Sequence, residues 1–332
     1  MRTTASTTMT DRSGLVAWLE HHQIALYLAA IAVGALLGAV IPGTEALEIG
    51  ITPAIAALLF VTFLSVPFTR LGAAFRDIRF LGTLLLLNFL VVPALVFGLS
   101  RFVAHDAALL IGVLLVLLTP CIDYVIVFSA LAGAAHEKLL AAAPLLMLVQ
   151  LALLPLCLLA FAGPGTLGVI EPGPFVEAFL LLIALPLALA AIVQWAAPRA
   201  RAARAVTTAG GAAMVPLMVL VLVVVVASQA HRVIADASAL VVLIPIYAAF
   251  LVVMAVVGTL TARAARLDTG SARALVFSGG TRNSLVVLPL ALALPEPLAM
   301  AAAVVVTQTL VELVGMVVYV RVIPRLIPSR PR

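Results

Sequence analysis

Two short polar motifs interrupt apolar runs of this chain and contain the residues that could bind a solute. The first, Thr119–Tyr124, reads Thr-Pro-Cys-Ile-Asp-Tyr, and the second, Gly279–Ser284, reads Gly-Gly-Thr-Arg-Asn-Ser. Proline lacks an amide hydrogen and glycine tolerates non-helical angles, so Pro120, Gly279 and Gly280 predict helix breaks. Unwound backbone can line a polar cavity within a membrane protein, although a simple proline kink packed with small residues would leave the same pattern.

Cys121 follows the helix-breaking proline directly and stands two residues before Asp123, which is itself a candidate contact for the solute. A thiol at this place offers a soft ligand that suits thiophilic species and does not suit sodium or carboxylates. The polar groups of Thr119, Asn283 and Ser284 could add contacts to the same solute. The alternative is that Cys121 acts as a small apolar residue, as unpaired cysteines in apolar segments commonly do.

Three ionisable residues lie deep inside apolar runs, namely Asp123, Arg282 and Glu312. A charge at the centre of a bilayer costs about 2.5 to 3.5 kcal/mol unless it is paired or hydrated. We therefore expect these residues to meet in the interior, with Arg282 balancing one of the two acids, either within a site or as a structural ion pair. Glu312 is then a candidate proton carrier. Gln308 and Thr307 could add neutral ligands or bond a neighbouring helix.

The elements that position these residues follow from the composition. With 65% hydrophobic and 10% charged residues over 332 positions, the chain cannot form a soluble domain with a polar exterior. Because about 20 apolar residues cross a bilayer, ten apolar stretches predict an all-α integral membrane protein with ten transmembrane helices. These stretches are 24–41, 52–68, 80–99, 107–133, 139–162, 175–196, 209–230, 238–261, 274–295 and 298–323.

A connection rich in glycine and proline divides the ten helices into two sets of five. The predicted organisation is an N-terminal cytoplasmic tail 1–23, a first five-helix repeat 24–162, a connecting loop 163–174, a second repeat 175–323 and a C-terminal tail 324–332. An odd number of spans in each half gives the halves opposite orientations, so we expect inverted repeats with a binding site near the midplane. Helices four and nine, the fourth of each half, are the two that break.

Basic residues near the predicted spans gather on one side, in the segments 70–79, 199–204, 263–273 and 325–332. Because basic loops stay cytoplasmic, we expect a multi-pass protein of the plasma membrane, of bacterial type, with both termini cytoplasmic. The net charge of +5 is then a topology signal, and no nucleic-acid partner is expected. The cysteines show no spacing typical of a metal site, so we expect no metal or cofactor, and Cys157 is interpreted as a packing residue.

On these residues the chain resembles the arsenical-resistance branch of the bile acid/sodium symporter superfamily. The most specific elements are Thr119-Pro120-Cys121 in span four and the acidic residue within Leu310–Leu313 in span ten. The resemblance covers essentially the whole chain and implies a panel domain of spans one, two, six and seven. It also implies a core domain of spans three to five and eight to ten, in which the broken spans cross at the site. In the arsenite exporters of this branch a cysteine and a glutamate are essential for proton-driven efflux, which implies these roles for Cys121 and Glu312.

The wider superfamily supplies a second possibility. The stretch Gly280–Ser284 also resembles the Gly-x-Gln-Asn-Ser stretch of sodium-coupled members, whose glutamine helps to bind sodium. Arg282 stands at the place of that glutamine, and a fixed guanidinium would repel sodium and could take over its structural role. The same arginine could instead receive the carboxylate of an organic anion.

Two transport functions therefore remain open. One is export of arsenite, with antimonite as a further possible cargo, in exchange for protons across the lipid bilayer. The other is sodium- or proton-coupled transport of a small organic anion. A membrane-embedded enzyme or sensor is least favoured, because the sequence contains no recognisable nucleophile motif, no metal-binding histidine pair and no phosphate-binding loop.

Overall fold

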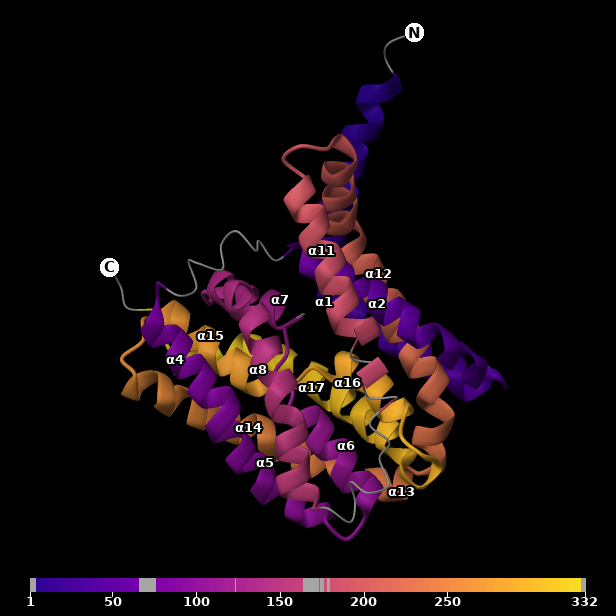
Figure 1. Cartoon of the computed structure of the whole chain (residues 1–332), viewed down its shortest axis with the longest axis vertical. Coiled ribbons are helices and arrows are strands. Elements are labelled where there is room, and N and C mark those ends of the chain that lie inside the picture. The colour runs from indigo at the N-terminus through magenta and orange to yellow at the C-terminus, as the bar shows by residue number, and fades with distance from the viewer. Residues whose placement is uncertain are drawn as a thin grey trace. The chain divides into compact units, whose positions relative to one another are not determined.

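A computed structural model describes the backbone of residues 4–65, 76–122, 124–163 and 180–329, together with residues 173, 176 and 177 (Figure 1). The side chains of residues 4–13, 151 and 183 are not part of the description. Asp123 and most of the predicted connecting loop 163–174 also lie outside the described residues. Where it is described, the chain is helical, with no β-strand beyond one isolated bridge, so the prediction of an all-helical protein is confirmed.

The first of two compact units contains Met1–Ser65 and Leu181–His231. Its elements are α1 (Thr4–Val40), η1 (Thr44–Gly50), α2 (Ile51–Ser65), most of η5 (Leu180–Ala184), α11 (Leu185–Ala196) and the greater part of α12 (Arg201–Ala235). Gly34 and Gly38 of α1 face α12, where a Cβ atom at Gly38 would meet the carbonyl oxygen of Ala227. Small residues four positions apart let two helix backbones approach closely, as in membrane helix pairs.

The second unit contains Val66–Leu180 and Arg232–Arg332. It begins with α4 (Ile78–Leu86), the π-helical turn η3 (Leu87–Val91), α5 (Val92–Ser100), η4 (Arg101–Val103), α6 (Ala107–Leu117), α7 (Tyr124–Leu131) and α8 (His136–Ala162). It continues with α13 (Ala237–Leu240), α14 (Leu243–Ala264), α15 (Thr269–Gly280), α16 (Ser284–Leu292), η6 (Glu296–Leu298) and α17 (Met300–Leu326). Every side chain of α6 from Ala108 to Leu117 is buried, which makes this apolar helix a core element of the unit.

The first unit thus contains the predicted spans one, two, six and seven, and the second contains the other six. This is the grouping that the resemblance implies for a panel and a core domain. α1 is continuous from Thr4, so the predicted tail 1–23 is helical from that residue, and the apolar segment of α1 runs from Gly14 to Val40. No proline occurs before Pro42 to interrupt it.

Six helical stretches are long and apolar enough to cross a membrane: 14–40, 44–65, 78–103, 201–235, 237–264 and 296–326. The two parts of α8, bent by 50° relative to each other, make a seventh if they form one span. The predicted spans 107–133 and 274–295 are each divided into two shorter helices, and the predicted span 175–196 lies partly outside the described residues. Length alone therefore counts fewer spans than the sequence predicts.

Candidate functional site

The two predicted breaks lie side by side in the second unit and pair through their backbones. Pro120 stands opposite Arg282 in an isolated antiparallel bridge. The Cys121 amide donates to the carbonyl of the residue preceding Arg282 at 3.3 Å, and the Asn283 amide donates to the Thr119 carbonyl at 2.8 Å. Because the residues flanking the bridge supply its hydrogen bonds, the missing amide hydrogen of Pro120 leaves no bond unmade. The crossing is therefore held by backbone groups from both breaks.

The guanidinium of Arg282 fills the space at the carboxyl ends of two half-helices. Its Nη2 donates to the carbonyl oxygens of Ser278 and Gly279 at 2.6 and 2.8 Å, and its Nη1 donates to that of Leu117 at 3.4 Å. These carbonyls belong to the last turns of α15 and α6, where helices leave acceptors without partners and carry partial negative charge. The side chain is completely buried. Arg282 is thus a tethered cation that satisfies both helix ends at once.

Asn88 completes the environment of this cation. Its Oδ1 accepts from Nη2 of Arg282 at 3.0 Å, while its Nδ2 donates to the Leu84 carbonyl and to Oγ of Ser278, both at 3.1 Å. The residue lies in the π-helical turn η3, and turns of this kind are frequent at functional sites. The Phe250 ring lies 5.6 Å from the guanidinium carbon. The cation is therefore held by an amide, three carbonyls and an aromatic ring.

The carboxyl group of Glu312, on α17, is buried on the other side of the crossing. Oε1 accepts from the Tyr124 hydroxyl at 2.6 Å, and Oε2 accepts from the Arg282 backbone amide at 2.8 Å and also from Gln308 Nε2. The Tyr124 hydroxyl is also within 3.0 Å of the Arg282 carbonyl oxygen. One carboxyl group therefore connects α17 to the start of α7 and to the break before α16.

The predicted ion pair between Arg282 and Glu312 is not present. The two buried charges at the crossing have uncharged hydrogen-bond partners instead. Glu312 bonds to the backbone amide of Arg282, while the guanidinium points to the helix ends. A predicted pair with Asp123 lies outside the described residues.

Several polar atoms at the crossing are buried without a hydrogen-bond partner. They are Arg282 Nε, Asn283 Nδ2, Ser284 Oγ and Gln308 Oε1. Asn283 uses its other side-chain atom, Oδ1, to cap α16 by accepting from the Val286 amide at 3.3 Å. An unsatisfied buried polar group costs about 1 to 3 kcal/mol, so these atoms indicate a place where water or a polar solute makes the missing bonds.

The remaining predicted residues are placed as follows. The Cys121 side chain is buried at the bridge, and Cys157 lies partly buried on α8. The hydroxyls of Thr119 and Thr307 donate to carbonyls of the preceding turn of their own helical segments, at 2.7 and 2.8 Å. Gln308 donates from Nε2 to Glu312, one turn further along the same helix.

The expectation that Gly279 and Gly280 form the break is wrong in detail. Both lie in the last turn of α15, and the glycines with positive φ among the described residues are elsewhere. The extended backbone begins at Thr281, with φ −93° and ψ 139°. A Cβ atom at Gly280 would meet the Tyr319 ring, and one at Gly279 would meet Met254 and Leu87. The two glycines therefore allow close packing rather than unusual angles.

Sequence reasoning gave no role to Tyr124 and Asn88, which the structure brings to Glu312 and Arg282. The sequence contained a feature that pointed to each of these two residues. Tyr124 is the last residue of the first polar motif, and Asn88 is a lone amide inside the apolar run 80–99. Polar side chains in such runs need a partner in the protein interior.

A membrane-embedded helical protein in which two broken helices cross around buried polar groups has the features of a membrane transporter. The model of the Sodium Bile acid symporter family matches residues 52–237, which is 186 of 332 residues, and the chain belongs to that family. The match includes the first break and ends before the second. The chain is therefore a multi-pass membrane protein of a transporter family. A search of curated proteins finds no match.

Proposed function

We propose that this chain exports arsenite in exchange for protons, through a site at the crossing of the two breaks. The observation that carries the proposal is the environment of Glu312. This acid is buried and accepts hydrogen bonds from Tyr124, Gln308 and a backbone amide, without an ion-pair partner among the described residues. Such a carboxyl group can gain or lose a proton without breaking an ion pair, as a proton carrier must.

The substrate in this proposal is neutral arsenous acid, whose hydroxyl groups both donate and accept hydrogen bonds. Cys121 lies buried at the bridge, and the partnerless atoms of Asn283, Ser284 and Gln308 supply the donors and acceptors that such a solute needs. The thiol displaces one hydroxyl of arsenic, so an S–As bond forms, an As–O bond breaks and water leaves with the thiol proton. The exchange is reversible and involves no oxidation.

Arg282 supports transport that does not depend on sodium. Its guanidinium already occupies the carbonyl-lined ends of α6 and α15, where a transported cation would otherwise find oxygen ligands. A second cation at this place would be repelled by a fixed charge in a medium of low dielectric constant. Protons therefore remain as the coupling ion in our proposal, with Glu312 as their carrier.

The proposal includes the ten-helix architecture predicted from the sequence, with two inverted five-helix repeats in the plasma membrane and cytoplasmic termini. The breaks in helices four and nine then meet near the midplane, where inverted-repeat transporters bind their substrates. In our proposal the site is exposed alternately to the two sides of the membrane, and Glu312 exchanges its proton in each cycle.

Transport of an organic anion is the second candidate, and the family match favours it. In that case the substrate carboxylate would need a free cation at the crossing. Both terminal nitrogens of Arg282, Nη1 and Nη2, bond to carbonyls and to Asn88, which leaves only Nε without a partner among the described residues, on a completely buried side chain. This arrangement supports the first candidate over the second.

Uptake of radiolabelled arsenite into everted membrane vesicles tests the proposal. With an imposed proton gradient, wild type should accumulate arsenite, and Cys121→Ser should lose more than nine tenths of this uptake, because a hydroxyl is a poor ligand for arsenic. Cys157→Ser is the matched control, since Cys157 lies on α8, outside both breaks, and this variant should transport normally. Sodium-driven uptake of a bile acid by wild type, without arsenite uptake, would establish the second candidate instead.

A further inference from the structure

A cavity of about 780 Å³ lies where three helices of the second unit end or begin, away from the crossing. It is lined by the carboxyl end of α14, the loop to α15, the first turn of α15 and the residues that follow α17. Its volume is within the range of about 300 to 1,000 Å³ typical of small-molecule sites. The candidate spans 237–264 and 296–326 both end here, so we expect the cavity to lie near the membrane surface, where these helices leave the hydrocarbon.

Two exposed arginines, Arg263 and Arg266, give the cavity a positive charge. The lining also contains Asp268, but its carboxylate caps α15 by accepting from the Ser271 amide at 3.0 Å and lies 3.5 Å from Lys138. Burial raises the pKa of Asp268, and the hydrogen bonds from Ser271 together with the nearby ammonium outweigh this and lower it below the usual value. Asp268 thus stays ionised, and its carboxylate is engaged by the Ser271 amide and by Lys138, which it shares with Asp77. The two arginines still exceed this one acid in the lining, so they can receive an external anion.

The backbone of Arg266 is strained in a way that indicates a role for its side chain. α14 ends in a Schellman motif, in which the Leu267 amide donates to the Ala262 carbonyl at 3.1 Å and the Arg266 amide to the Arg263 carbonyl at 3.0 Å. Glycine is the usual residue at the left-handed position of this motif. Arg266 occupies it with φ of 52°, and it is the one non-glycine residue with positive φ in the described part of the chain. A left-handed conformation costs a side-chain-bearing residue about 1 to 2 kcal/mol.

The rest of the lining is apolar, with Leu267, Leu326, Ile327 and Pro328 beside the two arginines. Arg263 uses one donor for the Leu326 carbonyl at 3.5 Å, which leaves other guanidinium donors for a ligand. A ligand that matches both parts of this surface has an anionic head and an apolar body.

We propose that this cavity binds an anionic phospholipid, with its phosphate between Arg263 and Arg266 and its glycerol and upper acyl carbons against the apolar residues. Guanidinium groups bind phosphate oxygens in pairs of parallel hydrogen bonds. The charge pattern of the sequence places this end of the helices on the cytoplasmic side, where anionic lipids attract clusters of basic residues next to a membrane span. The site is independent of the cargo and would make the second unit sensitive to lipid charge.

Binding of phosphatidylglycerol and phosphatidylcholine to the purified full chain, measured by native mass spectrometry, tests this site. Wild type should retain phosphatidylglycerol in preference, and the double variant Arg263→Gln, Arg266→Gln should bind it about tenfold to thirtyfold more weakly, given the contribution of each basic residue near a membrane surface. The matched control is Arg201→Gln, Arg204→Gln, which removes two exposed arginines from the start of α12. This control should bind as wild type does.

Arg266→Gly separates lipid binding from folding. The substitution relieves the left-handed strain, so thermal stability without added lipid should stay the same or rise, while binding of phosphatidylglycerol should fall about fivefold to tenfold. Equal retention of both lipids by wild type would overturn the proposal, as would equal losses in the double variant and its control. Displacement of the lipid by millimolar inorganic phosphate would show that the cavity recognises free phosphate and not a lipid.

Discussion

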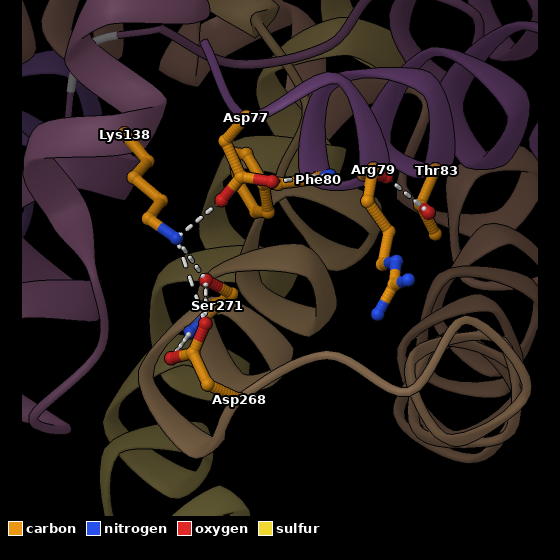
Figure 2. A network of polar contacts seen from close by, with 7 residues as sticks. All are labelled: Asp77, Arg79, Phe80, Thr83, Lys138, Asp268 and Ser271. Carbon is orange, nitrogen blue, oxygen red and sulfur yellow. Dashed lines mark hydrogen bonds and ion pairs between the residues drawn. The ribbon is translucent and has the colours of Figure 1, made fainter.

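The second unit contains two networks built from the same kinds of side chain, a cation and carboxyl groups, in opposite surroundings. In the network of Figure 2, Lys138 Nζ lies 2.6 Å from Asp77 and 3.5 Å from Asp268, and it donates to Ser271 Oγ at 2.7 Å. The side chains of Lys138, Asp77 and Asp268 are 36, 40 and 66% exposed. Both acids also cap helices, with Asp77 accepting from the Phe80 amide at 3.0 Å. Here opposite charges pair directly and tie α4, α8 and α15 together in contact with solvent.

At the crossing the charges are fully buried and do not pair with each other. Arg282 bonds to carbonyls and an amide oxygen, and Glu312 bonds to a hydroxyl, an amide and a backbone N–H. Removing one partner from a buried charge is much more costly than breaking an exposed pair. Exposed ion pairs in this unit therefore stabilise helix ends at a small cost in free energy. At the crossing, the buried carboxyl group has no ion-pair partner in the described part of the chain, so it can change its protonation state without breaking an ion pair.

The largest effect is expected from removing the buried cation. Arg282→Gln leaves carbonyls of α6 and α15 without a donor, and we expect it to lower the free energy of unfolding by about 3 kcal/mol or more. Thermal unfolding in detergent measures this. Sodium ions should partly restore the stability of the variant and leave wild type unchanged, because the vacated carbonyls can then bind a free cation. Arg101→Gln, which removes an exposed arginine bonded to the Phe161 carbonyl, is the control. Equal small losses in both variants would remove the special role of Arg282.

A smaller effect on stability and a large one on coupling are expected from Glu312→Gln. The amide keeps the shape of the side chain and one acceptor for Tyr124 or the Arg282 amide, but it cannot carry a proton. Arsenite uptake into everted vesicles should become at least tenfold less responsive to an imposed pH gradient. Glu296→Gln, in η6, should keep the response of wild type. An unchanged pH response in the Glu312 variant would exclude this residue from the coupling step.

The smallest effect is expected in the exposed network. Hydrogen bonding from Lys138 lowers the pKa of Asp77 below 3.8, with the Phe80 amide adding to the shift. This stabilisation is present above the unfolded pKa and is lost as the pH falls through the lower folded value. We expect Lys138→Met to lose less than about 1 kcal/mol at neutral pH, because solvent screens the pair. Its difference from wild type should begin to shrink in thermal unfolding below about pH 4 and should disappear once the pH is under the lowered pKa of Asp77. A difference that grows in acid would contradict the assignment.

Some features of the site could be predicted from residue types and spacing. Pro120 cannot donate within a helix, and Glu312 cannot face lipid without a large cost, so the position of the first break and the burial of the acid followed from the sequence. The hydrogen-bond partners of the Arg282 guanidinium could not be predicted from the sequence. A long guanidinium side chain can reach a carboxylate or helix carbonyls equally well, and only the packing of Asn88 and Leu117 around it decides between them.

The role of Gly279 and Gly280 could not be predicted from the sequence either. The absence of a side chain permits either unusual backbone angles or close contact, and the sequence of Gly279 and Gly280 is identical in both cases. In the structure, Met254 packs against Gly279 and Tyr319 packs against Gly280, so the two glycines serve close contact.

Composition and apolar run length by themselves determined that this is a helical membrane protein, because an unpaired backbone cannot be buried in lipid. The polar residues of 119–124 and 279–284 also located two interruptions, although the second begins only at Thr281. The antiparallel pairing of the two interruptions, the separation of Arg282 from Glu312 and the bond from Tyr124 were decided only by the tertiary structure. The contacts that Pro120 and Tyr124 make join residues more than 150 positions apart, and local sequence does not encode which distant groups will share one buried space.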